Sequence, residues 1–232
     1  LRLQVAQVRG QRRLNRQDLR AILDADVHVR GNEVTFTGSA EAVTRAADVL
    51  TELITIVRTG QGLTADAVER VVGMAADPDT HAAEILTQNI LSTRGKTIRP
   101  KTLNQKRYVD AIDQHTIVFG IGPAGTGKTY LAMAKAVQAL QAKEVNRIIL
   151  TRPAIEACER LGFLPGTLTD KIDPYLRPLY DALNEMMDPE IVPKLMASGT
   201  IEVAPLAYMR GRTLNDSFVD RKSTRLNSSH RC

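Results

Sequence analysis

The chain has 232 residues, of which 43% are apolar and 4% aromatic, and its formal net charge is +5. This length suffices for a small domain followed by a larger one, whereas the absence of tryptophan argues against an aromatic platform for single-stranded bases. No apolar run approaches the roughly 20 residues that cross a bilayer, and two cysteines exclude a disulfide scaffold and fit the reducing cytoplasm.

Residues 1–58 predict a small α+β domain. Asn15 can cap a short helix, and the alternating segments Val27–Val29 and Glu33–Thr37 around a Gly-Asn step predict a β-hairpin. Ser39 can cap a long helix with apolar residues at helical spacing. This order is similar to a KH-type RNA-binding unit, although the GXXG clamp of that unit is missing. A packing or partner-binding domain is therefore the alternative to RNA binding.

Residues 59–103 predict a linker of short helices and loops. Thr64 can cap a helix that continues to Val72, and a second helical stretch follows over residues 80–91. The polar, basic residues 92–102 contain a glycine and a proline, which predicts a loop leading into the next domain.

Residues 104–219 predict an α/β domain, a parallel sheet flanked by helices, because strand and helix patterns alternate. The segment Thr116–Gly122 is continuously apolar, as expected for a strand in the middle of such a sheet. The other predicted strands are 147–151 and 201–205, and helices are predicted near Tyr108 and over 128–141, 178–187 and 191–198.

The sequence GPAGTGKT fits the Walker A pattern G-x-x-x-x-G-K-[ST] at every fixed position, directly after a predicted strand and before a predicted helix. Main-chain N–H groups at such a turn point toward phosphates, and glycines let the ligand approach without Cβ clashes. The loop therefore predicts a nucleoside triphosphate site, for ATP above all, with a ligand-free glycine-rich turn as the alternative. The predicted binding residues are Gly122, Pro123, Ala124, Gly125, Thr126, Gly127, Lys128 and Thr129.

Lys128 and Thr129 are the predicted catalytic residues of this loop. The Lys128 ammonium can neutralise the β- and γ-phosphates, and the Thr129 hydroxyl can ligate Mg²⁺. Hydrolysis also needs a Walker B carboxylate at the end of a neighbouring strand to hold Mg²⁺. No good candidate follows the loop, since Ser217–Asp220 has only two apolar residues before its aspartate.

Five further stretches follow one another in a specific order. They are NQKRY from Asn104, TRPAIEA from Thr151, ERLGFLPG from Glu159, DKIDPYLRPLYDAL from Asp170 and IEVAPLAYMRGRTLND from Ile201. Together with the loop they resemble the PhoH family, cytoplasmic P-loop ATPases whose core is similar to that of superfamily 1 helicases. The hairpin region RGNEVTFTG is similar to the small domain that precedes the ATPase in this family, so the resemblance covers most of residues 15–219.

The resemblance implies that Gln105 reads the adenine edge, as the helicase-type glutamine does, and that Tyr108 stacks nearby. A solvated helix start is the alternative interpretation of Gln105. Cys158 departs from the family, which has glycine at this position. No Cys or His lies near it in the sequence, so a reactive or metal-bound cysteine is not expected.

Three arginines, Arg152, Arg210 and Arg212, lie just after predicted strand ends. Ligands of open α/β sheets bind at such ends. These side chains would contact phosphates or RNA, or else pair with carboxylates such as Glu156 or Glu159. Phe163 and Leu164 are expected in the core.

Residues 220–232 differ abruptly in composition from the rest. Four basic residues and one aspartate give them a net +3, so the preceding chain carries only +2, which is weak support for nucleic-acid binding. The resemblance implies an Ile-Leu-Asp-Glu Walker B strand after Val219, whereas this chain continues with DRKSTRLNSSHRC. We interpret residues 220–232 as a non-native tail on a truncated gene product. Because the chain opens at Leu1, we also expect that residues precede it naturally.

The combined prediction is a PhoH-type ATPase whose parent protein couples ATP hydrolysis to RNA metabolism in the cytoplasm. The resemblance implies ATP and Mg²⁺ as cofactors, and RNA, an RNA-processing endoribonuclease and a second copy of the chain as partners. For the 232-residue chain itself we expect weak nucleotide binding and negligible hydrolysis. The alternatives are a non-enzymatic RNA-binding or scaffold module with a structural ATP site, and a small-molecule kinase, although no arginine-rich lid is evident.

Overall fold

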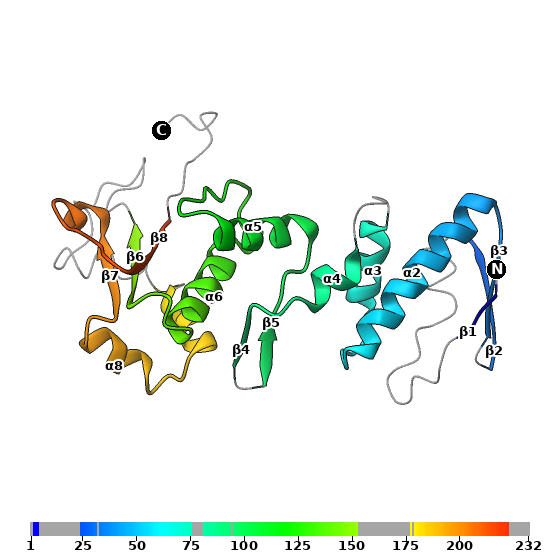
Figure 1. Ribbon diagram of the computed structural model, residues 1–232, viewed down its shortest axis with the longest axis horizontal. Coiled ribbons are helices and arrows are strands. Elements are labelled where there is room, and N and C mark those ends of the chain that lie inside the picture. The colour runs from blue at the N-terminus through cyan, green and yellow to red at the C-terminus, as the bar shows by residue number, and fades with distance from the viewer. Residues whose placement is uncertain are drawn as a thin grey trace, which may run out of the picture. The chain divides into compact units, whose positions relative to one another are not determined.

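The computed structural model describes residues 2–4, 24–31, 33–75, 81–93, 95–152, 177 and 179–222 (Figure 1). The chain divides into two compact units, the first with Leu1–Asn89 and Arg99–Arg107 and the second with Ile90–Ile98 and Tyr108–Cys232. The predicted helix near Asn15 lies outside the described residues, so the KH-like assignment of the first unit remains a prediction.

The first unit contains a small antiparallel sheet. Its strands, in spatial order, are β1 (Arg2–Gln4), β3 (Glu33–Thr37) and β2 (Asp26–Arg30). The predicted hairpin is confirmed, since Val27 lies opposite Phe36 and Val29 lies opposite Val34. Alternate residues of a strand point to the same face, and on one face Val27, Val34 and Phe36 are buried.

Helix α2 (Ala40–Arg58) packs against the buried residues of this sheet. As predicted, Ser39 caps it, because its side-chain oxygen accepts a hydrogen bond from the Ala42 N–H at 3.3 Å. The buried residues of α2 recur every three or four positions and form one apolar stripe. They are Ala42, Ala46, Val49, Leu53 and Ile56.

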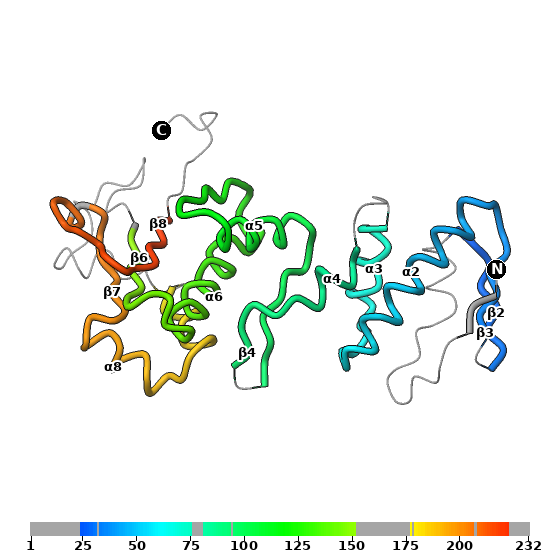
Figure 2. Tube along the Cα trace, viewed as in Figure 1, coloured from blue at the N-terminus to red at the C-terminus, as the bar shows by residue number. Residues whose placement is uncertain are grey.

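Two shorter helices, α3 (Ala65–Met74) and α4 (Ala82–Thr87), lie beside α2 (Figure 2). Thr64 caps α3 as predicted, accepting a hydrogen bond from the Ala67 N–H at 3.2 Å. The buried residues of both helices belong to the same core as α2. Part of the predicted linker 59–103 is therefore packed structure, because the apolar sides of two short helices need a neighbour that covers them.

A β-hairpin occupies part of residues 92–102, which were predicted as a loop. It consists of β4 (Leu91–Thr93) and β5 (Lys96–Ile98), with Gly95 turning the chain at φ 76°. Leu91 lies opposite Ile98, and both are buried. The loop prediction was wrong because strands of three residues are too short to show a period of two, so tertiary packing of this pair decides the structure.

A parallel sheet forms the centre of the second unit and confirms the mixed α/β architecture. Its order is β7-β6-β8, and Ile148 of β6 lies opposite both Ile201 and Phe218. The strand β8 was not predicted, and it includes Asp220 and Arg221, which were assigned to the tail 220–232. The strands are β6 (Arg147–Arg152), β7 (Ile201–Pro205) and β8 (Ser217–Arg221).

Helices accompany this sheet, all but the last of them at predicted positions. They are α5 (Leu103–Gln114), α6 (Lys128–Gln141), a helical segment over 179–186, α8 (Val192–Ala197) and the 3-10 helix η2 (Leu206–Met209). Helix α5 begins in the first unit and ends in the second. In the part of the chain that the structure describes, no helix combines the length and apolarity needed to cross a membrane.

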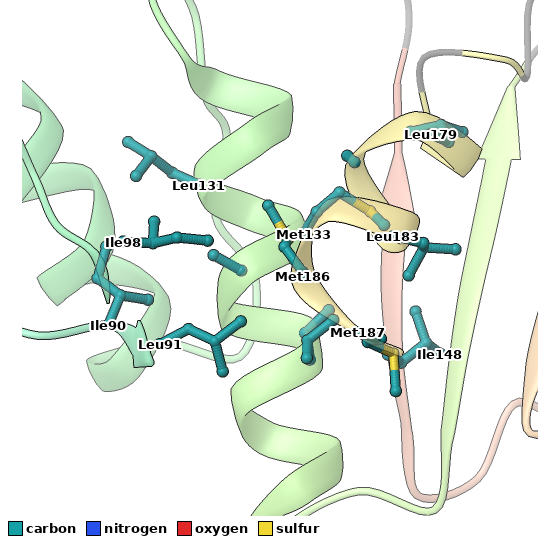
Figure 3. Packing of buried hydrophobic residues seen from close by; sticks show 14 of the residues in the cluster. Ile90, Leu91, Ile98, Leu131, Met133, Ile148, Leu179, Leu183, Met186 and Met187 are labelled. Carbon is teal, nitrogen blue, oxygen red and sulfur yellow. The ribbon is translucent and has the colours of Figure 1, made fainter. Parts of the chain in front are cut away.

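Helix α6 lies in the middle of the core of the second unit (Figure 3). Residues 131–137 are all buried, because apolar neighbours lie on more than one side of the helix. Figure 3 shows Leu91 and Ile98 of the hairpin on one side of α6, and Leu183 and Ile148 on the other. This packing fixes the helix whose first residues are Lys128 and Thr129.

The segment Thr116–Gly122 is not a strand, which corrects the prediction of a buried central strand. The side chains of Ile117, Phe119 and Ile121 are 74%, 82% and 93% exposed. A strand in the middle of a sheet needs hydrogen-bonded neighbours on both sides. In the described sheet that position belongs to β6, which pairs with β7 and β8, so the apolar composition of 116–122 does not lead to burial.

Candidate phosphate-binding site

The residues Gly122–Thr129 form a turn that runs directly into α6. Gly125 and Gly127 have φ angles of 79° and 81°, in the left-handed region that residues with a Cβ rarely adopt. A Cβ on Gly125 would meet no heavy atom within 4 Å. The backbone conformation, and not the available space, therefore requires glycine at this position.

The turn leaves main-chain donors at the start of α6. The first hydrogen bond of the helical ladder joins the Leu131 N–H to the Gly127 carbonyl oxygen at 2.9 Å. The N–H groups of Lys128, Thr129 and Tyr130 come before it, where a helix provides no acceptor of its own. With the positive end of the helix dipole, these donors favour an anion in front of α6.

Lys128 folds back over the turn. Its Nζ donates hydrogen bonds to the carbonyl oxygens of Gly122 at 2.9 Å and Pro123 at 2.5 Å, and to Thr126 Oγ1 at 3.0 Å. Thr126 Oγ1 in turn donates to the Pro123 carbonyl oxygen at 3.0 Å. These contacts hold the ammonium with neutral oxygens. A phosphate oxygen would be a stronger partner, because hydrogen bonds between two charged groups are shorter and stronger.

Gln105 lies at the start of α5, in the first compact unit. Its Oε1 accepts a hydrogen bond from the Lys101 N–H at 2.6 Å, and its own N–H donates to Thr102 Oγ1 at 3.2 Å. This reciprocal pattern is close to a capping box, in which a Thr and a Gln three residues later satisfy the first donors of a helix. The structure therefore gives Gln105 a local role, and its predicted contact with adenine remains a prediction.

Tyr108 lies in the second unit, where its ring packs against the core and against Gly120. Burial raises the pKa of its hydroxyl, and the negative charge of Asp220 raises it further. The ring is thus held next to the segment that leads into the turn. Its predicted stacking on a base is not tested by this packing.

The family model of the PhoH-like proteins matches residues 97–220, which is more than half of the chain and includes the turn and α6. The chain belongs to the PhoH-like protein family.

Individual PhoH-like proteins are similar over most of the chain. The PhoH-like protein of Mycobacterium tuberculosis (strain ATCC 25618 / H37Rv) is 69% identical over 207 residues, covering 88% of this chain and 59% of that protein. The PhoH-like protein of Bacillus subtilis (strain 168) is 46% identical over 199 residues, covering 85% and 62%. Protein PhoH of Escherichia coli (strain K12) is 44% identical over 117 residues, covering 50% and 33%. This chain thus spans less than two thirds of the length of these relatives.

The donors of this PhoH-like turn fit a triphosphate that carries Mg²⁺. Mg²⁺ usually takes one or two protein oxygens together with phosphate oxygens. Thr129, the second residue of α6, is only partly buried and offers such an oxygen. Among the described residues, no group of three or more His, Cys, Asp or Glu is placed to hold a metal ion.

The predicted arginines have different surroundings. Arg212 pairs with Glu202 of β7, its Nη1 and Nη2 donating to Oε1 and Oε2 at 2.5 and 2.8 Å. This hydrogen-bonded fork is the main cause that holds the pKa of Glu202 below its ordinary value. Arg210 is exposed, and the side chain of Arg152 lies outside what the structure describes. Outside the described residues are also Glu156, Cys158, Glu159, Phe163 and Leu164.

Lys135 and the partly buried Asp220 are two charged groups whose burial was not predicted. Lys135, 9% exposed, pairs through Nζ with Asp113 of α5 and with Gln138. The sequence feature that could have revealed the burial of Lys135 is its position as a single basic residue inside the apolar run of α6. Asp220 lies opposite Leu150 of β6, one position before the last pair of β8; its Oδ2 is buried and has no hydrogen-bond partner in the described structure. Burial raises the pKa of Asp220, and the nearby Lys222 opposes this.

Proposed function

We propose that this PhoH-like chain binds the triphosphate of ATP, with Mg²⁺, on residues Gly122–Thr129. The observation that carries the proposal is the position of Lys128. Its ammonium is held over the glycine turn by two carbonyl oxygens and a hydroxyl, at the positive end of α6. A cation and main-chain donors gathered at one turn suit a chain of phosphates better than any uncharged ligand.

Each group of the turn has a separate role in this proposal. The N–H groups at the start of α6 bind phosphate oxygens, and the two left-handed glycines keep the main chain open to the ligand. Lys128 exchanges its carbonyl partners for the β- and γ-phosphates, while Thr129 ligates the metal ion. Bound Mg²⁺ would neutralise charge on the phosphates.

The proposal for the whole protein goes further and rests on family membership. Family membership supports a P-loop ATPase. For the whole protein we propose ATP hydrolysis coupled to RNA metabolism in the cytoplasm, with an RNA-processing endoribonuclease as a partner. For the 232-residue chain we propose binding without sustained hydrolysis. The carboxylate of Asp220, the residue before the last of β8, is desolvated and lies close enough to Tyr108 to affect its hydroxyl, which suits it poorly to holding a metal ion.

Calorimetric titration with Mg-ATP tests the binding proposal. The chain should bind saturably, and Lys128→Ala should weaken binding roughly ten- to a hundredfold, since a hydrogen bond to a charged group contributes about 1.5–3 kcal/mol. Lys143→Ala, which removes a lysine after the end of α6, is the matched control and should bind as the unmodified chain does. Equal affinities for the chain and Lys128→Ala would refute the proposal. Release of phosphate above the Lys128→Ala background would refute the absence of turnover.

A further inference from the structure

The ring of Tyr108 lies against the main chain of Gly120. A Cβ placed on Gly120 would lie 3.0 Å from Tyr108 Cε2 and 3.2 Å from both Cζ and Oη. Distances this short are closer than ordinary van der Waals contact between carbon atoms. A Cβ at Gly120 would therefore push the ring or the main chain by a few tenths of an ångström.

The side chains on either side of Gly120 in the sequence are exposed. Phe119 and Ile121, on either side of Gly120, are 82% and 93% exposed. Their side chains do not hold the segment in place. The packed ring of Tyr108, in contrast, is a described contact against the main chain at Gly120.

A second contact ties the helix of Tyr108 to the helix of the turn. Asp113 of α5 forms an ion pair with Lys135 of α6, and the side chain of Lys135 is 11% exposed. A buried ammonium needs a partner, because leaving a charge unpaired away from water is costly. Helix α5 is therefore attached on one side to the segment that enters the turn, and on the other to the helix that leaves it.

We infer that Tyr108 is a positioning residue, which sets the main chain of the phosphate-binding turn by packing across Gly120. The inference rests on the proposed function, because it concerns the same turn. Gly120 is followed, two residues later, by Gly122, whose carbonyl oxygen accepts a hydrogen bond from Lys128 Nζ at 2.9 Å. A shift at Gly120 moves this acceptor and with it the anchor of the ammonium.

The ring, and not the hydroxyl, carries this role. Burial and the charge of Asp220 both raise the pKa of Tyr108, so the side chain remains a neutral phenol near pH 7. Tyr108→Phe keeps the packing surface and should keep the position of the turn. Tyr108→Ala removes it, and Gly120→Ala disturbs the same contact from the opposite side.

The experiment compares the affinities of Mg-ATP, Mg-GTP and inorganic triphosphate for the full chain and these variants. If Tyr108 positions the turn, Tyr108→Ala and Gly120→Ala should weaken all three ligands by the same factor of about five to ten, within the range of coupling by packed side chains. Tyr108→Phe should bind as the unmodified chain does. Tyr208→Ala replaces a tyrosine that is 55% exposed. This control should also bind the ligands as the unmodified chain does. Thermal unfolding identifies variants that do not fold, and Gly120→Ala tests the contact if Tyr108→Ala fails.

Three results would overturn the inference. Weaker binding of ATP alone in Tyr108→Ala, with inorganic triphosphate unaffected, would make Tyr108 a base contact. Equal loss in Tyr108→Phe would assign the effect to the hydroxyl. If Tyr108→Ala and Gly120→Ala both fold and bind the ligands as the unmodified chain does, Tyr108 has no role in positioning the turn. If Lys128→Ala also bound as the unmodified chain does, the proposed function itself would fail, so the two failures are distinguishable.

Discussion

Residues 116–121 and 122–129 are adjacent, and both have strong sequence patterns, but only the second takes the predicted conformation. The turn has left-handed glycines at Gly125 and Gly127 and leads into α6 at Lys128. The segment before it was predicted as a buried strand, and its apolar side chains are exposed. The turn depends on the φ angles of its own residues, whereas a strand depends on neighbours that the local sequence does not contain.

The first of three further predictions concerns Gly125 and has the largest expected effect among the three. Gly125→Ala should weaken Mg-ATP binding roughly five- to thirtyfold, because the left-handed conformation costs a residue with a Cβ about 1–2 kcal/mol. Gly199→Ala is the matched control, since Gly199 has φ 72° and equally open space but lies after α8. Gly199→Ala should lower the free energy of unfolding by a similar amount and leave the affinity for Mg-ATP unchanged. Unchanged affinity in Gly125→Ala would show that the φ angle does not govern the site.

The second prediction concerns the exposed apolar segment 116–121. Three exposed apolar side chains close together promote association between molecules. Phe119→Lys should lower self-association severalfold in analytical ultracentrifugation, because an exposed charge opposes association through apolar surface. Mg-ATP affinity should stay within about twofold, since the 82% exposed side chain is not part of the turn. An unchanged sedimentation profile would show that this segment does not mediate association.

The third prediction is smaller and concerns Asp220 in β8. Burial raises the pKa of Asp220 above its ordinary value, so the folded chain binds the proton more tightly than the unfolded chain. Stability should therefore be highest below the unfolded pKa and fall as pH rises toward the raised pKa. Asp220→Asn removes this dependence and should gain about 1 kcal/mol at neutral pH. Denaturant unfolding from pH 4 to pH 8 measures the difference; parallel curves would contradict the assigned burial.

Much of the fold could be predicted because its signals are local. Ser39 and Thr64 cap the helices expected of them, and α6 has the predicted bounds Lys128–Gln141. The β2-β3 hairpin follows from strand alternation around a short turn. The strands β6 and β7 follow from short apolar runs.

The remaining features depend on contacts between residues far apart in the sequence. The β4-β5 hairpin depends on the burial of Leu91 and Ile98 against α6. The packing of Tyr108 on Gly120 joins residues of different elements, and so does the pair of Asp113 with Lys135. In the site, the sequence predicted the turn and its lysine, while the packing that positions them required the structure.

The most direct test of the account follows the main-chain amide signals of residues 122–131 by NMR during titration with Mg-ATP. The account predicts saturable shifts concentrated at the glycines of the turn and at Lys128 and Thr129, with inorganic triphosphate moving the same signals and Lys128→Ala greatly reducing the response. If these amide signals did not move in the unmodified chain, the triphosphate would not bind at this turn, and the account would be contradicted.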